Sequence, residues 1–369
     1  MENAKACLLY GLAVGIGTRR ARPALLAQSA AERKREAGAI TRFIDGTSVS
    51  QGSAAFANAV LLSGRVQGDS HPCGHIGGVI IPSAIAAAQD ANASGAALLS
   101  AMVAGYESAL RIGRDHCADL SLRGFRTTPA YGVFGAAVAT GRLRGFDGMT
   151  MRHAIGLAAN FAGGLREYVD AGTEESPFQA GFAARNGVYV ADLADCGLKA
   201  TPTALTGGAG FYRAFAKKGI DYGQRLVEKL GEEFEFTTVT YKEYPACQFL
   251  RGIIRGLGEL RKEAPNTSVK NVAIRMNPYE ADFIGVRFAG PFESPAQTVM
   301  SAPFCAALAW TSGTASFDDL RTYDNAAVNT LVPKINIITD DKRERYEPHI
   351  AVSLDNGRTL EWKIGRAHV

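Results

Sequence analysis

The greatest concentration of chemically active side chains lies between Arg65 and His75, in the sequence Arg-Val-Gln-Gly-Asp-Ser-His-Pro-Cys-Gly-His. This stretch holds a carboxylate, Asp69, and two of the chain's six histidines, His71 and His75. Imidazole and carboxylate groups can exchange protons at neutral pH, and a guanidinium can hold an anion. The stretch can therefore supply general acid and base catalysis. Two other interpretations are a polar loop that caps the next helix, and a metal-dependent hydrolase with Asp69, His71 and His75 as ligands.

The same stretch is predicted to be a loop on a rigid support. Pro72 removes an amide donor and Gly74 raises the entropic cost of a helix, so a helix through this gap is unfavourable. An apolar segment follows, predicting helix from Ile80 to Arg114 with a turn around Asn92-Ala-Ser-Gly95. Leu98, Met102, Tyr106 and Leu110 recur every four positions, which is helical spacing, and we interpret them as core.

A glycine-rich loop feeding another helix is predicted between Arg123 and Ala137. Thr127 or Thr128 can cap that helix, and the exposed amides at a helix N-terminus favour an anion. Arg126 adds a full positive charge at the same place, so it can bind a carboxylate. The alternative is that Arg126 is a solvated loop residue.

A second candidate motif is Lys242-Glu-Tyr-Pro-Ala-Cys247. A lysine held beside Tyr244 and Cys247 can have its pKa lowered by burial, and it can then act as a base or an electrostatic catalyst. The alternative is an exposed lysine before a turn.

These motifs together resemble those of a known family. Asp69-Ser-His71, His75 and Val79-Ile-Ile-Pro-Ser-Ala84 resemble the Asp-Asp-Thr-His, His-Pro-Gly and Val-Ile-Pro-Ala-Ala-Leu signature of the MmgE/PrpD family. Lys242–Cys247 is similar to its Lys-x-Tyr-Pro-x-Cys motif, and residues 99–112 resemble its Gly-Tyr-Glu helix. The family includes 2-methylcitrate dehydratases, cis-aconitate decarboxylase and iminodisuccinate epimerase.

The resemblance implies a reaction and a set of site residues. The shared chemistry is proton removal next to a carboxylate of a small di- or tricarboxylic acid, with no metal or organic cofactor. The implied catalytic residues are Asp69, His71, His75 and Lys242. The implied residues for binding the anionic substrate are Arg65, Arg126, Thr127, Gln179, Tyr244, Cys247 and Arg251.

The chain departs from the family pattern at several of these places. Ser63, Arg126, Gln179 and Arg251 stand where the family has histidines, and Ser176 stands where it has a lysine. Val66 stands where dehydratases and decarboxylases have a further aspartate. We expect a 2-methylcitrate dehydratase-like hydro-lyase first. The alternatives are an isomerase or epimerase, a decarboxylase, the metal hydrolase above, and a degenerate non-catalytic member.

The length of 369 residues predicts two domains. The resemblance implies a mostly α protein, with a large all-α domain over residues 1–265 and a smaller α+β lid over residues 266–369. Helices expected in the first domain include Ser53–Val60, Met151–Leu165 and Ala180–Ala194. Expected strands of the second are Val269–Met276, Gly285–Phe288, Lys334–Ile338, His349–Leu354 and Leu360–Ile364, with helices at Thr298–Trp310 and Ser316–Asp324. Asp355-Asn-Gly-Arg predicts a hairpin between the last two strands.

Charge, cysteine content and hydropathy disfavour several other classes of protein. A net charge of +4 with no basic tract disfavours nucleic-acid binding. Six scattered cysteines without a Cys-x-x-Cys pair are typical of reduced thiols in a cytoplasmic protein. The sequence has no run of about 20 apolar residues, so we expect no membrane span. The resemblance also implies a homodimer, and a chain that begins late and ends at Gly365-Arg-Ala-His-Val369 before the closing helices, with reduced stability as a consequence.

Overall fold

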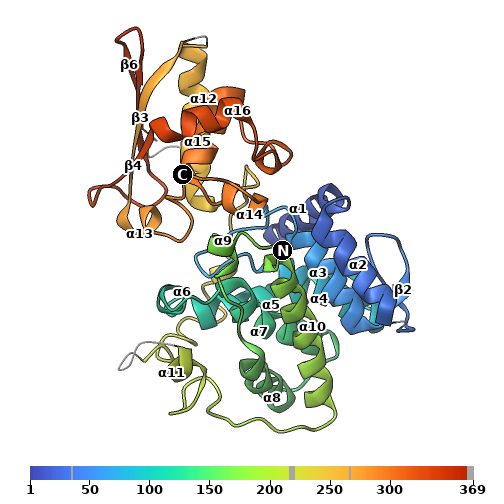
Figure 1. The fold of residues 1–369 in the computed structure, drawn as a ribbon. Coiled ribbons are helices and arrows are strands. Elements are labelled where there is room, and N and C mark those ends of the chain that lie inside the picture. The colour runs from blue at the N-terminus through green and yellow to red at the C-terminus, as the bar shows by residue number, and fades with distance from the viewer. Residues whose placement is uncertain (35, 216–220, 266, 364–369) are drawn as a thin grey trace. The chain divides into compact units, whose positions relative to one another are not determined.

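The computed structural model describes residues 1–34, 36–215, 221–265 and 267–363, and the chain divides into two compact units. Unit 1 comprises Met1–Arg166 and Glu175–Tyr241. Unit 2 comprises Glu167–Glu174 and Lys242–Val369 (Figure 1). This division differs from the boundary expected after residue 265, because helix α12 (Arg251–Glu263) packs against the strands and helices of unit 2.

Unit 1 is built from helices and one short strand pair. The helices are α1 (Glu2–Thr18), α2 (Arg22–Lys34), α3 (Gln51–Ser63), α4 (Gly77–Asp90), α5 (Gly95–Gly113), α6 (Cys117–Leu122), α7 (Thr127–Leu143), α8 (Gly148–Ala158), α10 (Ser176–Asp195) and α11 (Phe211–Phe215). Strands β1 (Ile40–Thr41) and β2 (Ser48–Val49) pair antiparallel.

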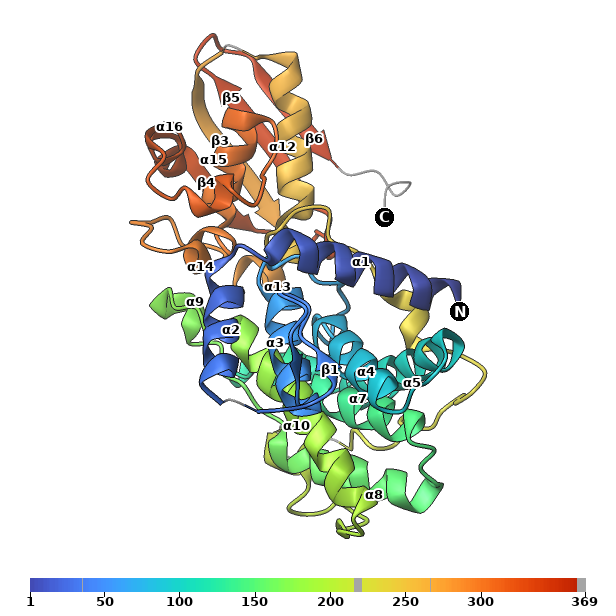
Figure 2. The same cartoon turned by 90° about the vertical axis from the view of Figure 1, so that its right-hand side faces the viewer.

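Helix α7 is the centre of unit 1. It packs against α4, α5, α8 and α10 (Figure 2). Every residue from Thr127 to Gly141 is buried. An apolar sequence on all faces suits such an enclosed helix. The approach to α5 is close, because a Cβ added at Gly105 would lie 2.7 Å from the carbonyl oxygen of Gly135. The N-terminal end of α7 therefore has a rigid base.

Most of the expected helices of unit 1 are confirmed. Ser53–Val60 lies within α3, and α4 and α5 are separated by a turn in which the Ser94 side chain accepts the amide of Ala97. One expectation is wrong in detail. The helix expected to reach Leu165 ends in a 3-10 turn at Phe161, before Gly163 and Gly164.

Unit 2 is a small α+β unit. Its helices are α9 (Tyr168–Ala171), α12 (Arg251–Glu263), α13 (Pro278–Ala281), α14 (Pro295–Thr298), α15 (Ala302–Ser312) and α16 (Ala326–Leu331). Its strands are β3 (Val269–Met276), β4 (Ile335–Thr339), β5 (His349–Leu354) and β6 (Thr359–Lys363), in the order β4-β3-β5-β6. The β3 and β4 strands run parallel and the other pairs antiparallel. Helix α12 contacts β5 and β6, and α15 contacts β4.

The predicted hairpin of β5 and β6 is confirmed, with Gly357 in the left-handed conformation at its turn. The predicted strand at Gly285–Phe288 is wrong, because Gly285 has a φ of +81° and the segment forms successive turns. The helix expected over Ser316–Asp324 is only a 3-10 turn, Asp319–Arg321. Residues 364–369, which include the expected end of the last strand and the terminal segment, lie outside the described residues.

The expected fold class is confirmed as a large helical unit accompanied by a smaller α+β unit. In the part of the chain that the structure describes, none of the helices combines the length and apolar character needed to cross a lipid bilayer.

Candidate active site

The loop of residues 64–76 lies against the N-terminal end of α7. Gly74 has a φ of +116°, and a Cβ at this position would lie 2.7 Å from Oγ1 of Thr128. The His75 amide donates to that same oxygen at 2.9 Å. Thr128 therefore caps the loop and not α7, whose N-cap residue Arg126 makes no side-chain capping bond. The predicted threonine cap of α7 is wrong, although the loop itself is confirmed.

Asp69 anchors this loop to two helices. Its side chain is buried, Oδ1 accepts the Gly77 amide of α4 at 3.0 Å, and Oδ2 accepts the Tyr106 hydroxyl of α5 at 2.5 Å. Burial, and then the charge of Asp69, raise the pKa of Tyr106 well above its ordinary value. Tyr106, interpreted from its spacing as core, is thus a hydrogen-bond donor to a predicted catalytic residue.

A second set of contacts ties the loop to the segment that ends unit 1. Ser70 and Thr240 exchange two backbone hydrogen bonds, at 2.8 and 2.9 Å. The next residue, Tyr241, lies with its hydroxyl 3.4 Å from Sγ of Cys7 on α1. Burial, followed by the nearby charge of Asp69, raises the pKa of Cys7 to about 11, so this thiol is protonated at neutral pH. The loop is thereby held from several sides.

The imidazole of His71 is buried and fixed by its neighbours. Its Nδ1 accepts the Cys73 amide at 3.1 Å, so the neutral ring carries its proton on Nε2, which lies 3.9 Å from Glu235. The side chain is 6% exposed, and burial lowers its pKa to about 4 against the weaker opposing effect of Glu235. His71 is therefore neutral at pH 7 and fixed in orientation.

His75 has the opposite tautomer. Its Nδ1 lies 2.7 Å from the backbone carbonyl oxygen of Asp69, which can only accept, so Nδ1 carries the proton. In the neutral ring the lone pair is then on Nε2. Because a carbonyl orients the ring and the residue is only partly buried, His75 has the arrangement of a general base.

Two predicted substrate-binding residues lie at the same end of α7. The Arg126 amide donates to Gly164 at 2.8 Å, and its guanidinium donates to the Ser176 carbonyl at the start of α10. The side-chain amide of Gln179 donates to the backbone carbonyl of Leu165 at 2.9 Å. Its Oε1 is buried and makes no hydrogen bond within the described residues, so it offers an acceptor beside this helix terminus.

Arg65 and Val66 occupy the start of the loop. The guanidinium of Arg65 donates to the Gly17 carbonyl near the end of α1, at 3.1 Å, and this contact gives no support to a role beside Arg126. Val66 has a φ of +56°, a conformation that a β-branched residue rarely adopts.

A buried ion pair on α5 positions the segment that carries Glu235. Arg111 contacts Glu107 at 2.5 Å and donates to four backbone carbonyls, those of Leu226, Glu228, Lys229 and Glu233. The other oxygen of Glu107 accepts the Phe236 amide at 3.0 Å. Sequence reasoning missed both residues. Two charges four positions apart in an otherwise apolar helix were the available signal.

The Lys242–Cys247 motif at the start of unit 2 is a bent segment without helix or strand. Lys242 is 3% exposed, and its ammonium group donates to the Ala246 carbonyl at 3.0 Å. Burial, followed by the charge of Glu243, raises the pKa of Tyr244 to about 12. Cys247 is buried, and Arg251 is the first residue of α12. The alternative of an exposed lysine is wrong.

The three residues considered as metal ligands have separate partners. Asp69 accepts from Tyr106 and Gly77, while His71 and His75 bond to backbone groups. Within the described ranges, no group of three or more histidine, cysteine, aspartate and glutamate side chains is arranged to hold a metal ion. This geometry does not support the metal-hydrolase alternative.

Comparison of the chain with known proteins shows the family to which it belongs. Residues 1–222 match the model of the MmgE/PrpD N-terminal domain. The chain belongs to the MmgE/PrpD family. The matched region includes the loop with Asp69 and His75 and the N-terminal end of α7, and it ends before the Lys242 motif.

Curated relatives of this MmgE/PrpD chain include cis-aconitate decarboxylases. One from Aspergillus terreus is 29% identical over 226 residues, covering 58% of this chain and 46% of the relative. A cis-aconitate decarboxylase-like protein of Aspergillus oryzae is 25% identical over 316 residues, covering 78% and 65%. The cis-aconitate decarboxylase of Homo sapiens is 25% identical over 240 residues, covering 60% and 48%. The chain spans about half the length of the first of these relatives.

Proposed function

We propose that this protein is a lyase that acts on a small di- or tricarboxylic acid by moving a proton at the carbon next to a carboxylate. The observation that carries the proposal is the fixed tautomer of His75, with its proton on Nδ1 and its lone pair on Nε2, beside the N-terminal end of α7. Family membership supports the same chemistry.

The surroundings of His75 suit such a reaction. A carbon next to a carboxylate is a weak acid, and negative charge grows on that carboxylate as the proton leaves. Arg126 and the amides at the start of α7 can stabilise this charge, because a guanidinium and a helix N-terminus both favour anions. Gln179 adds a side chain that can accept a hydrogen bond from a substrate hydroxyl or carboxylic acid.

The remaining predicted catalytic residues take different roles in the proposal. Lys242, which the resemblance of its motif to the family pattern implies as a catalytic residue, is the second acid or base. Asp69 and His71 act as positioning residues, because their polar atoms contact Tyr106, Gly77, the Cys73 amide and Glu235.

The relatives favour cis-aconitate as the first substrate to test. Decarboxylation requires a proton to be delivered to carbon as carbon dioxide leaves, and dehydration requires one to be removed as water leaves. The 2-methylcitrate dehydratase reaction expected from the family is therefore the second candidate. Epimerisation is the third, since Val66 and the replaced histidines indicate an altered site.

The test is turnover on cis-aconitate, 2-methylcitrate and related di- and tricarboxylic acids, together with deuterium incorporation at the carbon next to the carboxylate in heavy water. We expect His75→Ala and Lys242→Ala each to lower turnover by roughly 10² to 10⁴, the usual contribution of a general acid or base. His153→Ala and Lys270→Ala, in the same two units, are the matched controls. If both site variants exchange and turn over like the parent, the proposal is wrong.

Two further measurements separate the alternatives. Stoichiometric zinc or iron in active protein, with activity lost on chelation, would favour the metal hydrolase. No turnover of any acid in the panel, with substrate still bound, would favour a non-catalytic member. The proposal also includes a homodimer, which light scattering can test.

A further inference from the structure

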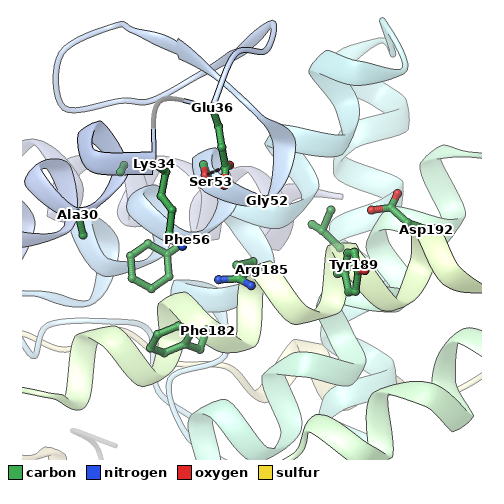
Figure 3. Close-up of a pocket in the computed structure, with 12 residues that line it drawn as sticks. Ala30, Lys34, Glu36, Gly52, Ser53, Phe56, Phe182, Arg185, Tyr189 and Asp192 are labelled. Carbon is green, nitrogen blue, oxygen red and sulfur yellow. Dashed lines mark hydrogen bonds between the residues drawn. The ribbon is translucent and has the colours of Figure 1, made fainter.

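Unit 1 contains a cavity that shares no lining residue with the proposed active site. It has a volume of about 490 Å³ and lies between α2, α3 and α10 (Figure 3). Small-molecule sites commonly have volumes of about 300 to 1,000 Å³. The residues that matter for its chemistry are Lys34, Glu36, Phe56, Phe182, Arg185, Tyr189 and Asp192.

Aromatic rings form one side of this cavity. The ring centroids of Phe56 and Phe182 are 5.1 Å apart, and Tyr189 lies two helical turns along α10 from Phe182. Phe182 and Tyr189 are 50% and 57% exposed, so their faces are accessible to a ligand. Such faces stack with planar aromatic groups.

Two cations enter the same space. Figure 3 shows the Arg185 side chain between those of Phe182 and Tyr189, with Lys34 reaching toward Phe56 from α2. Within the described residues, neither Lys34 nor Arg185 makes a hydrogen bond or an ion pair. The guanidinium and the ammonium are therefore available to an incoming anion.

The two carboxylates that line the cavity are already engaged. Glu36 accepts hydrogen bonds from the hydroxyls of Ser50 and Ser53, at the N-terminus of α3. Asp192 pairs with Arg144 at 2.6 Å. Hydrogen bonds from the two serines, and to a smaller extent the charges of Lys34 and Arg185, hold the pKa of Glu36 below its ordinary value. Each carboxylate thus has hydrogen-bonding or ion-pair partners other than Lys34 and Arg185.

We propose that this cavity binds a small aromatic anion. An aromatic ring of the ligand lies against Phe56, Phe182 and Tyr189, and its carboxylate or phosphate lies between Lys34 and Arg185. The site goes beyond the proposed function, because it requires neither His75 nor Lys242.

The test uses phenyl phosphate as the probe, with inorganic phosphate and phenol as matched controls that each lack one half of the ligand. Isothermal titration with the full chain should show saturable binding of phenyl phosphate, at least about tenfold tighter than either control. Arg185→Gln and Lys34→Gln should each weaken binding by about tenfold, the scale of one charge-assisted hydrogen bond. Phe182→Ala should weaken it through lost stacking.

Two control variants locate the binding. Arg33→Gln removes an exposed cation from α2 that does not line the cavity, and Arg126→Gln alters the proposed active site; both should bind like the parent. Each substituted cavity residue is exposed, and an unchanged thermal unfolding transition would verify that the variants are folded. Absence of saturable binding, or loss of binding in Arg126→Gln, would overturn the proposal. It would also be overturned if Arg185→Gln and Phe182→Ala split a dimer in light scattering while phenyl phosphate fails to bind, since the face is then a contact between copies.

Discussion

The hydroxyl of Tyr106 donates a 2.5 Å hydrogen bond to Oδ2 of Asp69, and both groups are buried. Tyr106 is on α5, and Asp69 is on the loop that carries His75. The bond therefore joins the helical core to the loop, and the backbone carbonyl of the same aspartate orients the ring of His75.

Tyr106→Phe should destabilise the protein. The variant keeps the ring but leaves a buried carboxylate oxygen without this donor, at a cost of about 1 to 3 kcal/mol. Urea unfolding measures the loss, with Tyr189→Phe, at an exposed tyrosine of the same unit, as the control. Equal stabilities of the two variants would contradict the anchoring role of Tyr106.

The buried His71 should make stability depend on pH. Its pKa is lowered from 6.5 to about 4 by burial, so between these values the unfolded chain binds the proton more readily than the folded protein. The free energy of unfolding should therefore fall as pH drops from 6.5 toward 4, by about 3 kcal/mol for this group. His116, whose pKa burial also lowers to about 4, acts in the same direction.

His71→Asn should remove the contribution of His71 to the pH dependence of the free energy of unfolding. The asparagine side chain can still accept a hydrogen bond from the Cys73 amide. Chemical unfolding at a series of pH values from 4 to 7 is the measurement, and His153→Asn is the control in the same unit. An unchanged slope in His71→Asn would show that this imidazole is not the titrating group.

Val66 should be a site of removable strain. A β-branched residue with a φ of +56° costs roughly 1 to 3 kcal/mol, whereas asparagine tolerates this conformation. Val66→Asn should therefore raise the free energy of unfolding by about 1 kcal/mol. Thermal unfolding measures the change, and Val66→Ile, which keeps the branching, should give no gain. A loss of stability in Val66→Asn would mean that packing of the valine outweighs the backbone strain.

Arg111 should control the order of the segment from Leu226 to Phe236. Lysine at this position keeps the charge but cannot reproduce the fork that reaches four carbonyls. Arg111→Lys should therefore speed amide hydrogen exchange in this segment by about tenfold or more, because each lost buried hydrogen bond costs about 1 kcal/mol or more. Arg142→Lys, at an exposed arginine of α7, is the control. Exchange that remains at the parental rate in Arg111→Lys would show that Arg111 does not hold this segment in place.

The sequence determined the element types and the chemically active stretches. Apolar runs with small residues specify buried helices, and Pro72 and Gly74 prevent a helix between the two histidines, so α3, α4, α5 and the loop followed from local pattern. Alternating apolar residues likewise specified β3 and β5. The same reasoning gives a wrong prediction for Gly285–Phe288. Its composition suits a strand, but Gly285 has a left-handed φ and the segment forms turns.

Only the tertiary structure decided what the polar side chains do. Composition treats His71 and His75 alike, yet the groups that reach them from elsewhere in the fold make one a buried neutral histidine and the other an oriented candidate base. Tyr106 and Arg111 read as parts of a core helix, and their partners lie 37 and more than 100 positions away. Periodicity reports which face of a helix is buried, but a hydrogen bond depends on the position of both atoms, and for distant residues the folded chain alone sets that position.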